Sequence, residues 1–231
     1  PYPQAGEQFG ASVELYGYFL LVGAPLRDET GTDSGAVFNL YFDGNTWQYA
    51  TTVVGQDTGA HDHFGHAIDQ RDNNLLVGAP GHAAGAGAAY VFNQGAIQWF
   101  QQAKLTAPAT LAGDAFGSAV AVGPDAAVVG APTKGPAGAA YAFAYGAGGW
   151  TLAGELLPPS GQPFQRVGSA VALDGDVAVI GCPSTDFRHQ WTNVYHRQAG
   201  TWQYVDTVES YLASCQQGDT GCWLGDVLAK V

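Results

Sequence analysis

The sequence predicts an all-β protein, a β-propeller built from four-stranded antiparallel blades. Three recurring markers predict this fold. The first is a Phe-Gly pair followed by Val-Gly-Ala-Pro, or close variants of both, with the Gly-Ala-Pro glycines at Gly23, Gly78, Gly130 and Gly181. The second is a tryptophan at Trp47, Trp99, Trp150 and Trp202, and the third is an aromatic strand between the proline and the tryptophan. A period of about fifty residues is typical of a stacked array of one small unit.

The third copy shows the expected unit most clearly. Its strands alternate small and branched or aromatic residues, and its proline stands at a strand end, where no ladder donor is needed. The four strands expected in this copy are 118–122, 126–129, 139–143 and 150–156. The other copies follow the same plan, with first turns at Tyr16-Gly17 and at 174–176.

A four-stranded sheet of this kind cannot bury both faces alone, and radial stacking of sheets about an axis solves the problem. Small residues then crowd the inner strands, and the tryptophan strand covers the gap between blades. We therefore expect one domain with repeats at about 7–60, 61–112, 113–163 and 164–214, and the start of a fifth at 215–231.

The Phe-Gly and Val-Gly-Ala-Pro pattern resembles the FG-GAP repeat, the blade unit of integrin α-chain propellers and of many secreted bacterial proteins. Segments 99–105 and 113–122 are most similar to the bacterial branch. The resemblance implies a propeller, usually of seven blades, usually outside the cytoplasm and usually serving adhesion or ligand binding. Four full units leave three interpretations open: a fragment of a larger propeller, a closed small ring, or a partial ring whose open edges associate.

The family often carries a calcium loop, Asp-x-Asp-x-Asp-Gly, between the first two strands of a blade. None of the corresponding turns here offers the six to eight oxygen ligands that calcium takes. The nearest approach is Asp69, Asp72, Asn73 and Asn74. The sequence therefore predicts no cofactor, with calcium at these four residues as the alternative.

The charge balance narrows the class of partner. Twenty acidic residues against eight basic ones give a net charge of −12, which disfavours nucleic acid and anionic membranes. No apolar run approaches the roughly 20 residues that span a bilayer. We expect a protein or carbohydrate ligand outside the cell or at its surface, and homo-oligomers through open blade edges remain an alternative.

The three cysteines have different expected roles. Cys215 and Cys222 bracket a polar loop and could close a small disulfide ring in an oxidising compartment. Cys182 replaces the alanine of Gly-Ala-Pro and is expected to act as a small buried hydrophobe.

A histidine-rich segment is the first candidate site. His61 and His63 would point the same way on an extended strand, and with Asp62 they could hold a transition metal. The alternative is a polar loop that enters a blade, because the equivalent segments 6–8 and 113–115 keep the acid and lack the histidines.

Two loops that follow Gly-Ala-Pro form the second candidate site, because loops on a rigid scaffold often carry function. Their candidate ligand-binding residues are Asp28 and Asp33 in the first loop, and Asp186, Arg188, His189 and Trp191 in the second. An exposed Trp191 could stack on a sugar ring. The alternative is ordinary loop variation.

Catalytic motifs are missing from the sequence, with no nucleophile elbow, zinc-protease helix or phosphate-binding loop. The expected function is therefore a non-enzymatic extracellular binding, adhesion or assembly module. The alternatives are a carbohydrate-binding lectin, a structural subunit that assembles through open blade edges, and a polysaccharide-acting propeller enzyme. That enzyme would use His61, His63 or His66 with a tyrosine as acid and base.

Overall fold

The computed structural model of the chain describes residues 5–95, 98–158, 166–183 and 189–211. They form four antiparallel sheets of four strands, and in each sheet the strands pair in chain order. Blade 1 contains β1 (Ser12–Tyr16), β2 (Phe19–Ala24), β3 (Ala36–Phe42) and β4 (Trp47–Val53). Blade 2 contains β5 (Ala67–Arg71), β6 (Asn74–Ala79), α1 (His82–Gly85), β7 (Ala88–Gln94) and β8 (Trp99–Leu105).

Blade 3 contains β9 (Ala119–Val122), β10 (Ala126–Ala131), β11 (Ala139–Gly146) and β12 (Gly149–Glu155). Blade 4 contains β13 (Ala170–Asp174), β14 (Val177–Pro183), β15 (His189–Gln198) and β16 (Thr201–Tyr211). The prediction of an all-β fold with four-stranded blades is confirmed. The predicted fifth unit lies outside the described residues. No helix among the described residues is long and apolar enough to cross a membrane.

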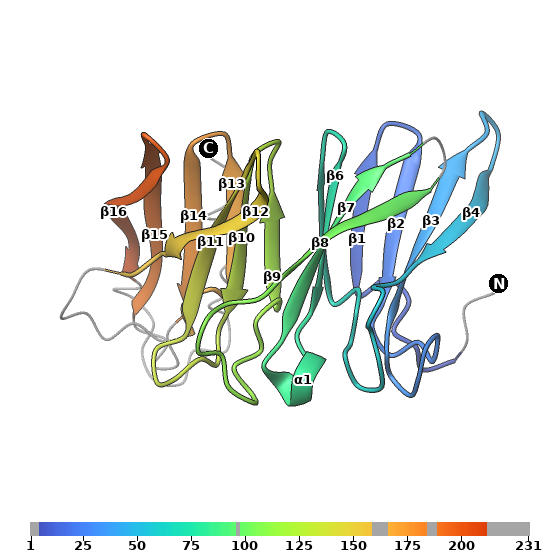
Figure 1. Ribbon diagram of the computed structural model, residues 1–231, viewed down its shortest axis with the longest axis horizontal. Helices are drawn as coiled ribbons and strands as arrows, with labels where there is room; N and C mark the ends of the chain where they lie inside the picture. Colours follow the sequence, from blue (N-terminus) through green and yellow to red (C-terminus); the bar gives the residue numbers. More distant parts are fainter. Residues whose placement is uncertain (1–4, 96–97, 159–165, 184–188, 212–231) are drawn as a thin grey trace.

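The blades stand side by side in chain order, and blades 1 and 4 lie at opposite ends of the molecule (Figure 1). The inner strands pack in sequence, β1 on β5, β5 on β9 and β9 on β13. This arrangement places a hydrophobic core between each pair of neighbouring blades. As a result, β6 and β10 of the two middle blades are buried at every position.

The Phe-Gly phenylalanines explain how neighbouring blades are joined. Phe64 and Phe116 begin blades 2 and 3, yet each forms an isolated β-bridge to a glycine of the preceding blade, Gly35 and Gly87 respectively. Both rings are fully buried. Phe64 packs edge-to-face on Tyr90, with ring centroids 5.5 Å apart. The Phe-Gly segment is therefore inserted between two blades and contacts both.

The glycines of the two motifs form a seam of main-chain contacts. Within blade 2, the Gly65 amide donates to the Gly78 carbonyl at 3.0 Å. The equivalent pairs in the other three blades make the same hydrogen bond at 2.9–3.1 Å. A Cβ atom on Gly78 would lie 1.9 Å from the carbonyl oxygen of Gly117 in blade 3. The same approach joins Gly23 to Gly65 at 2.1 Å and Gly130 to Gly168 at 2.0 Å. Glycine is required here because two backbones touch.

The recurring tryptophans cover the blade joints, as expected from the sequence. Trp99, Trp150 and Trp202 are partly buried against the cores between blades 1 and 2, 2 and 3, and 3 and 4, respectively. Trp47 belongs to blade 1, the first blade among the described residues, and it is 42% exposed.

The seam predicts a sharp contrast between two glycines at the same motif position. Gly78→Ala should lower the free energy of unfolding by about 3 kcal/mol or more, because the methyl group would overlap a main-chain oxygen. Gly181→Ala is the matched control, since the nearest atom to its Cβ would be the Ala170 Cβ at 3.2 Å, and it should cost about 1 kcal/mol or less. Urea denaturation of both variants measures the difference. Equal losses would contradict the seam.

Candidate functional site at the loop rim

In blades 1 to 3, the loops that follow Gly-Ala-Pro gather at one end of the molecule, the end that carries α1 (Figure 1). We call this end the loop rim. At the joint between blades 1 and 2, the loop of blade 1 pairs with the segment that leads into Phe64. The amides of His61, His63 and Phe64 donate to the carbonyls of Thr32, Asp33 and Ser34 at 2.7, 3.2 and 3.0 Å. These bonds fix the two loop backbones against each other.

The joint between blades 2 and 3 repeats two of these three main-chain hydrogen bonds. The Ala115 amide donates to the Gly85 carbonyl at 2.8 Å, as the His63 amide does to Asp33. Gly85, Gly113 and Ala115 therefore occupy the positions that Asp33, His61 and His63 hold at the first joint.

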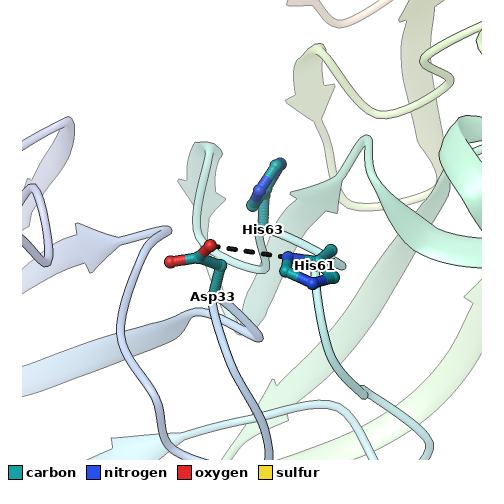
Figure 2. A group of neighbouring side chains, drawn as sticks. All are labelled: Asp33, His61 and His63. Atoms are coloured by element: carbon teal, nitrogen blue, oxygen red, sulfur yellow. Dashed lines mark ion pairs between the residues drawn. The ribbon is translucent and has the colours of Figure 1, made fainter.

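Asp33, His61 and His63 come together in space (Figure 2). One ligand atom from each lies within 4.8 Å of the others, and among the described residues this is the group with that metal-binding geometry. His61 Nδ1 lies 3.4 Å from Asp33 Oδ2. The His61 side chain is exposed and the other two are half-buried.

The predicted metal set of His61, Asp62 and His63 is wrong in its carboxylate. The segment is not an extended strand, since His61 and His63 have φ of 65° and 56°. Asp62 is 6% exposed and faces the interior of its own blade. Its Oδ2 accepts from the Gly59 amide at 2.9 Å and lies 2.7 Å from His82 Nδ1. Asp33 of the preceding blade takes its place in the cluster.

A structural pair that recurs in the repeat explains the role of Asp62. The acid two residues before Phe-Gly meets the base two residues after the Gly-Ala-Pro proline. Arg27 Nη1 donates to Glu7 Oε2 at 2.9 Å in blade 1, and His82 meets Asp62 in blade 2. These bases were not among the predicted site residues, although the sequence carries a signal for them: the position holds Arg27, His82 and Lys134 in the first three copies.

Cations also lie over the aromatic ring of the third strand in blades 1 to 3. Arg27, Lys104 and Lys134 lie 5.6, 5.7 and 4.7 Å from the ring centroids of Phe38, Tyr90 and Tyr141. Lys104 Nζ also lies 2.6 Å from Asp57 Oδ2, and the Tyr90 hydroxyl donates to Asp57 Oδ1 at 2.9 Å. Burial, together with this carboxylate, raises the pKa of Tyr90 far above its ordinary value. These charges therefore serve blade packing.

Asp28 and Asp33 remain at the surface of the rim. Asp28 Oδ1 accepts from the Asp33 amide at 2.8 Å, which shapes the loop. Beside them lies a shallow cleft of about 230 Å³, lined by Ala5, Gly6, Glu7, Leu26, Asp28, Thr32 and Asp33. The cleft is acidic, because Glu7, Asp28 and Asp33 line it and Arg27 pairs with Glu7 but not with the two aspartates.

The second predicted ligand loop is only partly described. Asp186 and Arg188 lie outside the described residues, and of His189 the backbone is described as the first residue of β15. The expectation that Trp191 is exposed is wrong, because it is 7% exposed and packs in the core between blades 3 and 4. Strand alternation is the reason: Trp191, Asn193 and Tyr195 occupy the buried face of β15.

The residues considered for calcium connect blades at the end opposite the rim. Asp69 Oδ2 accepts from the Val122 amide at 2.5 Å, and Asn74 Nδ2 donates to the Gly123 carbonyl at 2.9 Å. Burial raises the pKa of Asp69, and the hydrogen bond from Val122 opposes that rise. Asp72 and Asn73 form the β5–β6 turn, where Asp72 has a φ of 53°.

Cys182 is fully buried in the core between blades 3 and 4. Burial raises the pKa of its thiol to about 12, so the group is protonated at neutral pH, in agreement with a small hydrophobe. The proposed Cys215–Cys222 ring lies outside the described residues.

His61 occupies a position that glycine holds in two other copies, and this predicts a gain of stability on substitution. Gly6 and Gly113 have φ of 92° and 89° there. In metal-free protein, His61→Gly should raise the free energy of unfolding by about 0.5–1 kcal/mol, because left-handed backbone is costly for other residues. His66→Gly, at an exposed position nearby without positive φ, should lower it by a similar amount. Parallel urea denaturation tests this, and a loss for His61→Gly would contradict it.

Comparison with known proteins agrees with this architecture. A family model described as "FG-GAP repeat" matches residues 3–41, 47–92 and 99–143. The fourth copy is not matched, although it forms a complete blade. No curated protein matches the chain.

Among solved structures, a protein from Lactobacillus plantarum is 15% identical over 83% of this chain and 54% of its own, with a TM-score of 0.53. The N-terminal domain of Nup159 is 13% identical over 83% of this chain and 46% of its own, with a TM-score of 0.45. This chain thus spans about half the length of each, and the first likeness supports the fold alone. Since the family model matches more than half of the residues, the chain belongs to the FG-GAP repeat family.

Proposed function

We propose that the chain is a non-enzymatic extracellular binding or adhesion module whose loop rim contacts a protein ligand that carries basic groups. The observation that carries this proposal is the division of charges at the rim. Glu7, Arg27, Asp62 and His82 are used in packing within their blades. Glu7 also lines the open cleft, but its charge is paired with Arg27. Asp28 and Asp33, which line the cleft as well, are the charges available to a partner.

Size and charge favour a macromolecular partner over a small molecule. A cleft of about 230 Å³ is smaller than the roughly 300–1,000 Å³ of typical small-molecule pockets. The chain carries a net charge of −12, which favours association with a basic surface. Burial of Trp191 removes the aromatic platform on which the carbohydrate interpretation depended, so a protein ligand is preferred. The extracellular location is inferred from the family resemblance.

A displayed random-peptide library, selected on the immobilised chain in EDTA, tests the proposal. We expect enriched peptides to be basic, and Asp28→Lys to weaken their binding at least about tenfold, because it places like charges together. Asp72→Lys, at the opposite end, is the charge-matched control and should leave binding within about twofold. Peptides insensitive to Asp28→Lys would contradict a rim site, and specific binding on a glycan array would favour the lectin alternative.

A second candidate function is assembly through the outward faces of the end blades. On β1, Val13 and Leu15 are each 62% exposed, and Phe9 is 41% exposed, whereas its counterparts Phe64 and Phe116 are fully buried. On β14, alternate residues are left partly open, whereas β6 and β10 are buried throughout. The face of blade 1 carries the Phe-Gly side of the interblade seam, and the face of blade 4 carries the Gly-Ala-Pro side.

Solution mass measures this directly. If the end faces drive association, light scattering should give a mass above the 24.0 kDa of one chain at micromolar concentration, and Leu15→Glu should return it to the monomer value. Phe100→Glu, an exposed apolar residue on β8 of blade 2, is the control and should leave the mass unchanged. A monomer at all concentrations would rule this function out.

A further inference from the structure

We infer that Asp33, His61 and His63 bind one divalent transition-metal ion, with zinc as the representative, across the joint between blades 1 and 2. The inference concerns the metal alone and does not depend on the proposed protein ligand. It assigns a role to a cluster that blade packing does not use.

The donor set suits such an ion. Two imidazoles and one carboxylate are typical zinc ligands, and three protein ligands leave a fourth position for water or a ligand group. Two donors bound at about 2.0–2.1 Å to a tetrahedral ion lie about 3.4 Å apart. The Asp33 Oδ2 to His61 Nδ1 distance is 3.4 Å, and His63 offers a nitrogen within 4.8 Å of a ligand atom of each residue.

The backbone holds these donors in place before any ion binds. Three main-chain hydrogen bonds pair the loop of blade 1 with the segment that leads into blade 2, and two of them are made by His61 and His63 themselves. A fourth bond, from the Asp33 amide to Asp28 Oδ1 at 2.8 Å, fixes the Asp33 backbone. The backbone that carries the three donors is thus already ordered, which reduces the ordering entropy that opposes binding.

The neighbouring joint supplies an internal comparison. Two of the three main-chain hydrogen bonds recur there, and the positions of Asp33, His61 and His63 hold Gly85, Gly113 and Ala115, whose side chains cannot ligate a metal. Blade packing therefore needs no side-chain donor at these positions. His61 even adopts left-handed backbone, with φ of 65°, where Gly113 has 89°. A strained residue that packing does not require points to a function of its side chain.

The position of the site gives the ion two consequences. Its ligands come from both sides of a blade joint, so a bound ion links blade 1 to blade 2 and stabilises the folded state by mass action. The open coordination position lies on the loop rim, beside the cleft that Asp33 helps to line.

Metal titration of the whole, tag-free chain tests the inference with zinc chloride alone. Calorimetry should show one ion per chain. His61→Gly and His63→Ala, which restore the residue types of the next joint, should each weaken binding at least about tenfold, as loss of a ligand costs at least what loss of an outer partner does. Cobalt(II) should give the intense visible absorption of a four-coordinate site in the wild-type chain and lose it in both variants.

Two substitutions next to the cluster serve as matched controls. His66→Asn and Asp62→Asn should each keep zinc affinity within about twofold, although Asp62→Asn removes the charge that faces His82. Absence of stoichiometric zinc binding in the wild-type chain would overturn the inference, as would equal binding by the His61→Gly, His63→Ala double variant. Loss of binding in Asp62→Asn, with His61→Gly unaffected, would also overturn it. Because no peptide is present here and the peptide selection is done in EDTA, each proposal can fail alone.

Discussion

Contact between main chains, at glycines of successive blades, is the constraint on which this structure depends. Gly78 can sit against the Gly117 carbonyl only because neither residue carries a side chain at the point of contact. That approach brings Phe116 between the blades, where it packs with Tyr141 and Phe143. The hydrophobic cores thus follow from the seam, and the repeated motif describes a joint between two units rather than a feature inside one.

The overall fold could be predicted because its markers are local and periodic. A blade contains neighbouring strands, so the order of Phe-Gly, Gly-Ala-Pro and tryptophan fixes the sheet and its topology. The partner of each motif was harder to predict. The phenylalanine was assigned to its own repeat, whereas Phe64 lies against Gly35 of the preceding one. Contacts of this kind join residues that the sequence separates, and spacing alone does not reveal them.

The candidate site shows the same limit in its side chains. Both histidines were candidates from the sequence, but the carboxylate that lies beside them is Asp33, 28 residues before His61 and in a different blade. Asp62 was misassigned because an acid beside two histidines resembles a ligand, while its counterparts Glu7 and Asp114 are buried as it is. Trp191 was misassigned because β15 begins at His189, earlier than expected, so strand alternation turns the ring inward.

The charged residues at the rim fall into two groups when equivalent positions of successive blades are compared. One group recurs in kind from blade to blade, as Arg27, Lys104 and Lys134 do over an aromatic ring, even when the cation comes from a different strand or loop. The other group, Asp33 with His61 and His63, occurs once among the residues that the structure describes. The charges that recur stabilise blade packing, whereas the cluster that does not recur is not needed for packing and is available for binding.

The main-chain hydrogen bonds that the first two joints share have an evolutionary consequence. Because main-chain hydrogen bonds hold both loops at the second joint while Gly85, Gly113 and Ala115 contribute no functional groups, the loops tolerate new side chains without rebuilding the scaffold. Duplication of a blade therefore copies both a structural unit and loop positions that can accept new functional side chains. Each copy can then diverge independently, so one chain can acquire several unlike recognition sites from a single ancestral loop.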